Sequence, residues 1–278
     1  MPGAFRLIGI GAITALLAAC GSSTPVTSPS AAPPSAVVPS AAPSATSAPP
    51  TQTPTRGASP TPGAATPGPG ASAAIDPADF TATVDNPWFP LVPGTTLSYQ
   101  GTKDDKPSID TFEITHETAV IDGVTCLAIH DTLTQGGKVA EQTVDWYAQD
   151  RAGNVWYFGE DTKTLDATGK VTSTEGTWQA GAGGAQPGIF MPAQPQIVQS
   201  FQHEFAADAQ DHFVVLQIGV PVKVPYGAFA DAMITAEWTP LEPDVLSEKT
   251  YVQGIGEVNE FDVAGSNEGF QLVSVTKP

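Results

Sequence analysis

The stretch DWYAQDRAGNVWYFGE, residues 145–160, holds two of the five Trp and two of the five Tyr residues of the chain. It consists of two runs of alternating character on either side of the loop 150–153. A glycine at the end of such a four-residue loop, here Gly153, suits a type I turn closed by a left-handed residue. The stretch therefore predicts a β-hairpin in which Asp150 pairs with Asn154.

The expected register gives this hairpin two faces of different character. One face is apolar, and we expect it to pack into the core. The other face is amphipathic, because phenol groups stand beside a carboxylate. The residues expected on the apolar face are Val144, Trp146, Ala148, Trp156 and Phe158. Those expected on the amphipathic face are Asp145, Tyr147, Gln149, Val155, Tyr157 and Gly159.

Alternation with a period of two recurs along most of residues 95–276, and no pattern indicates a helix longer than two turns. Turn signals such as Asp122-Gly123 and Gly136-Gly137 separate the runs. This spacing predicts hairpins that follow one another in a meander. Aromatic residues on both faces of several runs exclude a sheet with one side in water. The expected fold class is mainly β with little helix: a single antiparallel meander sheet, strongly curved or closed into a half-barrel or barrel.

Three proline-rich segments, at 86–94, 181–195 and 239–243, interrupt the expected meander, and the third is expected to join two strands. Residues 86–94, NPWFPLVPG, open the domain, and their aromatic side chains are expected to plug one end of the sheet. Residues 181–195 have about the length at which a loop without secondary structure is usually functional.

Residues 1–20 have the features of an export signal. Arg6 is their only charged side chain, and residues 7–19 form an apolar run that is too short for a transmembrane helix. The run ends in Leu-Ala-Ala followed by Cys20, which resembles the bacterial lipobox. The resemblance implies a covalent diacylglycerol on Cys20, and two acyl chains are enough for stable anchoring. The alternative is a secreted protein whose signal happens to end in cysteine.

Residues 21–74 have the composition of a tether. They contain 13 of the 27 prolines among many Ala, Ser and Thr residues, and Arg56 is their only charged side chain. Such a segment cannot bury a core and is expected to be disordered. The expected organisation is a lipoprotein signal peptide with lipobox (1–20), a disordered tether (21–74) and a β-rich globular domain (75–278).

The domain 75–278 is strongly acidic. It carries all 29 Asp and Glu residues and, since Arg6 and Arg56 lie outside it, nine of the 11 Lys and Arg residues, a net charge of −20. This charge argues against nucleic acid and anionic lipid as partners. It leaves binding of cations, binding of basic partners, or solubility alone as explanations.

Cys126 is the only thiol besides Cys20. It lies in the middle of an expected strand, where it is expected to pack as a small hydrophobe.

Several phrases of the domain resemble a known group of proteins. The phrases span most of residues 85–260 and are NPWFPLVPG, IDGV, DWYAQD, GNVWYFGEDT, QPGIFMPAQP, TPLEP and QGIGEV. They are similar to a family of secreted or lipid-anchored bacterial β-rich domains without assigned biochemistry, and the anchor and tether resemble those of actinobacterial-type lipoproteins. The resemblance implies a shared fold and an envelope location, and it brings no catalytic residue with it. The meander with its turn at 222–229 is also similar to lipoprotein-carrier-like half-barrels.

The sequence lacks the motifs of several common enzyme classes. It has no G-x-S-x-G, and His203-Glu204 is followed by Ala207 where a second zinc-binding histidine would stand. The glycine-rich run at 181–184 lacks the Lys-Ser/Thr of a phosphate loop. The sequence therefore leans away from an enzyme without deciding the question.

Two groups of residues carry weak metal-binding signals. Apart from such a cation, no cofactor is expected other than the covalent diacylglycerol on Cys20. Imidazole and carboxylate groups across a hairpin tip could hold a divalent cation, although solvated hairpin charge is the simpler explanation. Oxygen ligands around the first hairpin could take Ca²⁺, although they would more simply stabilise its turn. The first group is His203, Glu204, Asp208, Asp211 and His212. The second group is Asp145, Asp150, Asn154, Glu160 and Asp161.

Aromatic side chains give the remaining candidate for a binding site. Aromatic-lined concave surfaces bind apolar or sugar ligands, although a β core contains the same residues. The side chains expected on one shared surface, beside Asp145, are Tyr147, Tyr157, Trp178, Trp238 and Trp88.

These observations lead to three functional hypotheses. The first is a cell-envelope lipoprotein on the extracytoplasmic face of the membrane that presents a non-catalytic binding or scaffold domain. The second is a carrier of a lipid or other apolar ligand in a half-barrel cavity, and the third is a metal-dependent enzyme. The expected partners are the membrane, through the lipid anchor, and an apolar small molecule or an envelope protein.

Overall fold

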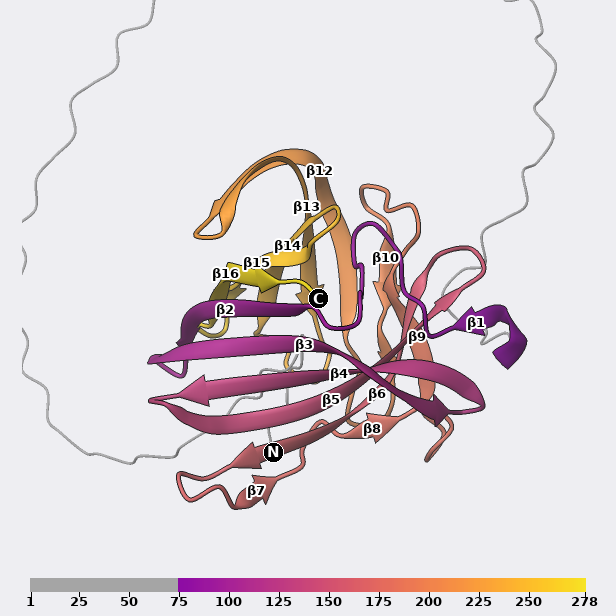
Figure 1. Ribbon diagram of the computed structural model, residues 1–278, viewed down its shortest axis with the longest axis horizontal. Coiled ribbons are helices and arrows are strands. Elements are labelled where there is room, and N and C mark those ends of the chain that lie inside the picture. Colours follow the sequence, from indigo (N-terminus) through magenta and orange to yellow (C-terminus); the bar gives the residue numbers. More distant parts are fainter. Residues whose placement is uncertain (1–74) are drawn as a thin grey trace, which may run out of the picture. The chain divides into compact units, whose positions relative to one another are not determined.

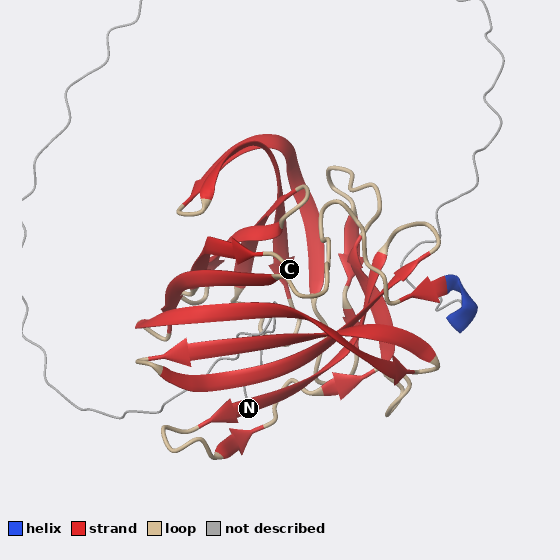
Figure 2. Ribbon diagram, in the orientation of Figure 1, coloured by secondary structure: helices blue, strands red, loops and turns tan. Residues whose placement is uncertain are grey.

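The computed structural model of the protein describes residues 75–278. The predicted signal peptide (1–20), with the Cys20 that is expected to carry the lipid, and the predicted tether (21–74) lie outside the described residues. Nearly all regular structure in the described part is β-strand, with one short 3-10 turn, η1 (Pro77–Asp79) (Figure 2). Within residues 75–278 no helix is long and apolar enough to cross a bilayer. The prediction of a mainly β fold with little helix is confirmed.

The strands form one antiparallel sheet in which most neighbours are also neighbours in the chain (Figure 1). One meander runs from β2 to β6 and a second from β12 to β16, and the last strand, β16, pairs with β2 to join them. The predicted meander is therefore confirmed. The strands are β1 (Phe80–Thr81), β2 (Thr96–Lys103), β3 (Lys106–Ile121), β4 (Val124–Gln135), β5 (Lys138–Asp150), β6 (Val155–Leu165), β7 (Val171–Ser173), β8 (Trp178–Gln179), β9 (Gln186–Met191), β10 (Ser200–Gln202), β11 (Glu204–Phe205), β12 (His212–Val224), β13 (Gly227–Trp238), β14 (Leu246–Val252), β15 (Gly256–Ala264) and β16 (Gly269–Thr276).

One short segment brings the two edges of the sheet together. Its first half, β10, pairs with β12, and its second half, β11, pairs with β9. Between them the backbone N–H of His203 donates to the carbonyl of Asp211 over 2.7 Å. A Cβ on Gly188 of β9 would lie 2.2 Å from the Gln202 carbonyl oxygen, so only glycine permits this approach. The sheet is thereby nearly closed into a barrel, as predicted.

The hairpin of β5 and β6 has the turn that the sequence predicts. The backbone N–H of Asp150 donates to the carbonyl of Asn154 over 2.9 Å, and Gly153 has a φ of 89°. The Asp150 carboxylate accepts bonds from the backbone N–H groups of Ala152 and Asn154 and from the indole of Trp156, each over 2.9 Å. This side chain therefore holds the turn together, as Asp residues do in many loops.

The two faces of this hairpin are placed differently from the prediction. Asp145, Tyr147 and Tyr157 point into the barrel and are 0%, 1% and 6% exposed. Trp146 and Trp156, expected in the core, lie on the outer face and are only half-buried. Ala148 and Phe158 of the predicted apolar face are fully buried, as expected. The expectation is corrected for the two tryptophans and for the other face, because the side chains with the carboxylate and the phenols line the interior.

The outer face of the hairpin is nevertheless partly covered. Phe80 of β1 packs edge-on against Trp156 and Phe158, with ring centroids 5.7 and 5.5 Å apart. β1 itself pairs with the end of β5, where Phe80 lies opposite Asp150. The first strand of the domain thus explains why this hairpin is aromatic on both faces.

The segment 84–94 is buried against the interior of the barrel. Phe89 contacts Phe112, Tyr147 and Phe190, with ring centroids 6.2, 5.4 and 4.6 Å apart. The Asn86 amide fixes the segment by donating to two backbone carbonyls of neighbouring loops. The predicted burial of aromatic side chains from this segment agrees with the structure.

The segment 181–195 is not a loop without secondary structure. Its middle part forms β9, which pairs with β6 on one side and β11 on the other. The expectation of a long functional loop is corrected here, because QPGIFM completes the sheet next to the closing segment.

Candidate functional site

Four of the residues predicted as a ligand-binding set meet inside the barrel. The rings of Tyr147 and Tyr157 are stacked, with centroids 4.9 Å apart, and Trp178 packs edge-on against Tyr157 at 5.5 Å. The Tyr157 hydroxyl donates to the Asp145 carboxylate over 2.6 Å, and the Trp178 indole donates to the Glu204 carboxylate over 3.2 Å. The polar atoms of Tyr157 and Trp178 are thus bonded to buried carboxyl groups.

Trp238 does not belong to this group. It is half-buried, and its ring stacks on His212, with centroids 5.5 Å apart and planes 11° from parallel. The next residue back, Glu237, is 1% exposed. Because side chains alternate along a strand, Trp238 lies on the opposite face from Glu237. Trp88, which was also expected on this surface, is buried in the segment 84–94. Within residues 75–278 its ring does not contact the stacked rings of Tyr147 and Tyr157.

The interior of the barrel also contains an unusual number of charged residues. Barrel interiors of this size are normally filled by apolar side chains, and buried carboxylates are rare unless they are paired. We call this set the interior carboxyl cluster. It consists of Asp110, Asp131, Glu141, Asp145, Glu160, Glu204, Asp211, Glu237, Glu257 and Glu260, each at most 6% exposed. The buried lysines of the described domain are Lys103 and Lys249.

Asp110 and Asp131 form a carboxyl pair within this cluster. Burial, followed by the charge of Asp110, raises the pKa of Asp131 well above its usual value. Burial also raises the pKa of Asp110, to about 6. The two carboxyl groups therefore titrate as a coupled pair that resists full ionisation.

A hydroxyl ladder joins the next two strands of the cluster. Thr143 on β5 and Thr162 on β6 lie opposite each other, with hydroxyl oxygens 2.9 Å apart, and Thr162 donates to Glu160 over 2.9 Å. Asp131 lies opposite Thr143 on the other side of β5. The cluster is thus continuous across β4, β5 and β6, because the inward-facing positions of these strands are in register.

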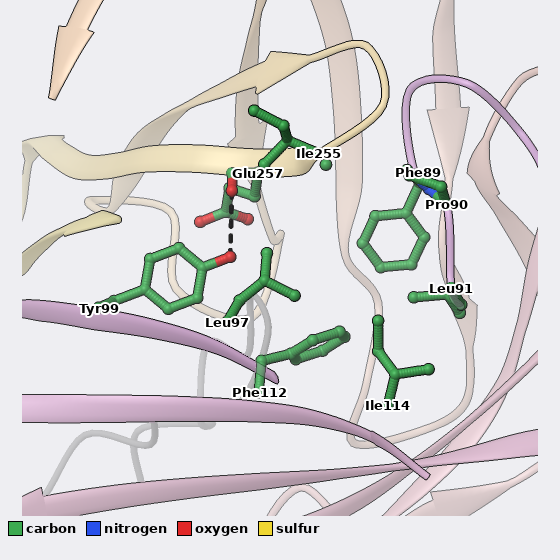
Figure 3. A pocket seen from close by; sticks show the side chains of 10 residues that line it. Phe89, Pro90, Leu91, Leu97, Tyr99, Phe112, Ile114, Ile255 and Glu257 are labelled. Carbon is green, nitrogen blue, oxygen red and sulfur yellow. Dashed lines mark hydrogen bonds between the residues drawn. The ribbon is translucent and has the colours of Figure 1, made fainter. Parts of the chain in front are cut away.

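A small cavity lies where the aromatic and acidic parts of the interior meet (Figure 3). Its volume is about 10 Å³, and its walls include Phe89, Leu97, Phe112, Tyr99 and Glu257. The Tyr99 hydroxyl donates to the backbone carbonyl of Glu257 over 3.0 Å. A cavity of this size holds about one water molecule.

The first predicted metal-binding group is divided between two surfaces. His203, Glu204 and Asp211 are at most 3% exposed inside the barrel, whereas Asp208 is exposed and His212 stacks on the outer Trp238. The ring of His203 lies between Phe190 and Phe213, and burial lowers its pKa well below the usual value, so it is neutral. Among residues 75–278, no group of three or more His, Cys, Asp or Glu side chains is placed to hold a metal ion.

The second predicted metal-binding group is likewise not a single site. Asp145 and Glu160 are buried in the interior, whereas Asp150 and Asn154 belong to the turn described above. Asp161 is half-exposed and forms an ion pair of 2.7 Å with a lysine on its own strand. The structure thus gives the turn residues the stabilising role that was the simpler explanation.

Cys126 lies fully buried in β4. Burial raises the pKa of its thiol to about 12, which keeps it protonated at neutral pH. A protonated, buried thiol is not a nucleophile, so the structure agrees with packing as the role of Cys126.

Sequence reasoning missed the interior carboxyl cluster. A signal was present in the strand patterns, because Asp110 shares its face with Phe112 and Ile114, and Asp131 shares its face with Ile129 and Leu133. A charged residue at an otherwise apolar position of the period-two pattern indicates a buried charge once the strand is known to be covered on both faces.

No family model and no curated relative matches this sequence. Two solved structures are similar to it. One is a protein from Bacteroides fragilis, described as exported and with a YmcC-like fold, at 14% identity and a TM-score of 0.39, over 68% of this chain and 99% of that one. The other is from Parabacteroides distasonis, described as a lipoprotein, at 9% identity and a TM-score of 0.36, over 68% of this chain and 98% of that one. Likeness at this level assigns neither a family nor a function.

Proposed function

We propose that the chain is a cell-envelope lipoprotein, anchored through a diacylglycerol on Cys20 at the extracytoplasmic face of the membrane. The domain 75–278 is a non-catalytic binding or scaffold module that acts through its outer surface. The packed interior of the barrel is the observation that supports a module acting through its surface. The cavity at the junction of the aromatic and acidic parts has a volume of only about 10 Å³. The lipobox-like end of the apolar run before Cys20 supports the first statement.

The carrier hypothesis has little support from this interior. Pockets that bury a small-molecule ligand have volumes of about 300–1,000 Å³. The cavity beside Phe89 is more than ten times smaller, and the rings of Phe89 and Phe112 in its wall are in contact with each other. A lipid could enter only if these side chains moved apart.

The enzyme hypothesis also has little support from the geometry. The described domain contains buried acidic pairs such as Asp110 and Asp131, but they lie inside the packed barrel rather than in a cleft that a substrate could enter. The predicted metal-binding residues are spread over the interior, a turn and the outer face. A binding or scaffold role through the surface requires none of these groups to be accessible.

The two cysteines of the chain allow a matched test of the anchor. We expect Cys20→Ala to move the full-length protein from the membrane fraction to the medium, or to leave it as unprocessed precursor, because no acyl chains can be attached. Cys126→Ala should leave the protein in the membrane fraction, since its thiol is buried in the domain. Fractionation and incorporation of radiolabelled fatty acid measure both outcomes. A Cys20 variant that stays on the membrane with its signal removed would contradict the proposed anchor.

A further inference from the structure

Lys249 is a fully buried lysine of the described domain. Its side chain is 0% exposed and points into the barrel from β14. Three carboxylates surround its Nζ, at 3.5 Å for Glu257, 3.6 Å for Glu260 and 3.8 Å for Glu237. All three distances exceed a normal hydrogen bond, and the Nζ has no hydrogen-bond partner among the described residues.

The arrangement is costly as a set of ion pairs. One ammonium faces three carboxyl groups that are each at least 93% buried, and buried charges that lack hydrogen bonds are strongly unfavourable. Burial alone would lower the pKa of Lys249, but the charges of Glu257, Glu260 and Glu237 outweigh it and raise that pKa. Burial raises the pKa of Glu257 to about 7 and that of Glu260 well above its usual value. Glu257 is therefore protonated in a substantial fraction of molecules at neutral pH.

The third carboxylate has a different environment. Glu237 on β13 accepts a hydrogen bond from the Thr235 hydroxyl over 2.9 Å, and the Tyr251 hydroxyl lies 3.5 Å from the same oxygen. These contacts fix the position of the Glu237 carboxyl group on β13. Glu257 and Glu260, both on β15, remain as the carboxyl groups available to react with the Lys249 amine.

We propose that Lys249 and Glu257 condense to an intramolecular isopeptide bond that joins β14 to β15. Lys249 Nζ would be the nucleophile, and the side-chain carboxyl carbon of Glu257 would be the electrophile. Glu260, which lies directly opposite Lys249 in the register of the two strands, would be the proton acceptor.

The condensation balances without a further reactant. Glu257 and Glu260 share the charge of one ammonium, and in the arrangement that reacts the proton lies on Glu257 while Glu260 is ionised. The Lys249 ammonium gives one proton to the Glu260 carboxylate, and the free amine attacks the carboxyl carbon of protonated Glu257. The C–N bond forms, the C–OH bond breaks, and the hydroxyl leaves as water with a second proton from the same nitrogen. The products are one amide, one water molecule and protonated Glu260, so the total charge of the three groups is zero before and after the reaction.

Two features of the fold favour this step. Groups held in reactive positions can reach effective concentrations of about 10⁵–10⁸ M, and two paired strands hold Lys249 and Glu257 with little freedom. The cavity beside Glu257, about 10 Å³ in volume, has room for the water molecule that is released (Figure 3). The product is neutral, so the cost of a buried ammonium and carboxylate disappears.

Trypsin gives a direct test, because Lys249 lies between two consecutive tryptic peptides of the full-length protein. Without the bond, digestion of the denatured protein cuts after Lys249 and yields peptides 224–249 and 250–278 at their sequence masses. With the bond, trypsin cannot cut after Lys249, and mass spectrometry should find the single peptide 224–278, lighter by one water molecule. Complete recovery of the two separate peptides at their sequence masses would overturn the proposal.

Three variants assign the groups. Lys249→Arg keeps the charge but removes the amine, and we expect the full sequence mass and restored cleavage at that position. Glu257→Ala should also abolish the loss of water, whereas persistence of the loss would overturn the assignment of Glu257 as the electrophile. Glu260→Ala should slow the reaction in a time course after synthesis, and an unchanged rate would overturn its role as proton acceptor. The peptide map of the unmodified sequence decides the central point even if a variant does not fold.

Discussion

At the scale of single residues, the interior of the barrel is organised by hydrogen bonds between aromatic and acidic side chains. Tyr157 donates to Asp145 over 2.6 Å, and Trp178 donates to Glu204 over 3.2 Å. Burial raises the pKa of Tyr157 well above its usual value, and Asp145 adds to the shift, so the phenol remains a donor at all ordinary pH values. The aromatic rings fill space, while their polar atoms satisfy buried carboxyl groups.

The bond between Tyr157 and Asp145 gives the first residue-scale prediction. Tyr157→Phe keeps the ring stacked on Tyr147 but removes the hydroxyl that donates to the buried Asp145. Loss of such a donor to a buried charged group costs about 1–3 kcal/mol of unfolding free energy. Urea unfolding measures the change. Tyr226→Phe, on an exposed tyrosine, is the control and should change stability by less than about 0.5 kcal/mol. Equal stabilities of the two variants would contradict the role of the bond.

Phe89 gives the second residue-scale prediction, because its ring is in contact with three other aromatic rings. Phe89→Ala should cost about 3–5 kcal/mol of unfolding free energy, as large truncations in a core do. It should also enlarge the adjacent cavity enough to bind a small apolar molecule such as benzene. Thermal unfolding with and without benzene measures both effects. Val92→Ala, on an exposed side chain of the same segment, should leave stability unchanged and show no benzene effect.

At the scale of elements, the hairpin 145–160 separates what the sequence predicts from what it does not. Its turn was predictable because the determinants are local: Asp150 and Gly153 lie within the loop they stabilise. The inward face was not predictable from the hairpin alone. The inward face depends on β1, which covers the outer face of the hairpin. It also depends on a register shift between β5 and β6 near Gly159. At this position β8 passes so close that a Cβ added to Gly159 would lie 2.4 Å from the Trp178 carbonyl oxygen.

The same distinction applies to the candidate site. The shared surface of Tyr147, Tyr157 and Trp178 was predicted from the sequence, and Tyr147 and Tyr157 lie on one face of a single hairpin. The sequence nevertheless placed the opposite face of that hairpin in the core. Trp238 was misplaced because its face depends on the register of β13, which lies far away in the sequence. The interior carboxyl cluster was not predicted, because acidic residues in strands normally indicate the solvent side. Only closure by the segment 200–205 places these acidic side chains inside.

The turn gives the element-scale prediction. Asp150→Ala removes the acceptor of two backbone N–H bonds and of the Trp156 indole bond, so we expect a loss of about 1–3 kcal/mol in unfolding free energy. Asp161→Ala, which removes only a half-exposed ion pair on the same hairpin, should cost less than about 1 kcal/mol. Urea unfolding of both variants is the measurement. A larger effect at Asp161 would show that the turn is not what Asp150 stabilises.

At the scale of the whole molecule, the barrel combines a strongly negative domain with acidic groups in its interior. Buried carboxyl groups with raised pKa values bind protons more tightly in the folded than in the unfolded state. Such groups stabilise the fold fully below their unfolded pKa, and this contribution is lost as the pH rises through the folded pKa. The domain should therefore be less stable in mildly alkaline than in neutral solution.

Glu268 makes this prediction specific. Burial raises its pKa to about 8, partly opposed by Lys103, whose Nζ lies 3.6 Å away. Unfolding free energy should fall by about 1–2 kcal/mol between pH 6.5 and pH 8.5. His203, which is neutral in the folded state, opposes this fall by only about 0.4 kcal/mol, because the usual pKa of histidine lies at the lower end of the window. Glu268→Gln should flatten the profile in urea unfolding. A stability that rises with pH across this window would contradict the assignment, whether or not Glu257 is joined to Lys249.

The central claim is that the barrel interior is filled by its own side chains, so that the domain acts through its surface. Native mass spectrometry of the full-length protein, released from membranes in mild detergent, tests this most directly. The folded protein and the same sample after denaturation should have identical masses, because nothing is held non-covalently inside. A lighter species after denaturation, with release of a lipid or other small molecule, would contradict the account and favour a carrier.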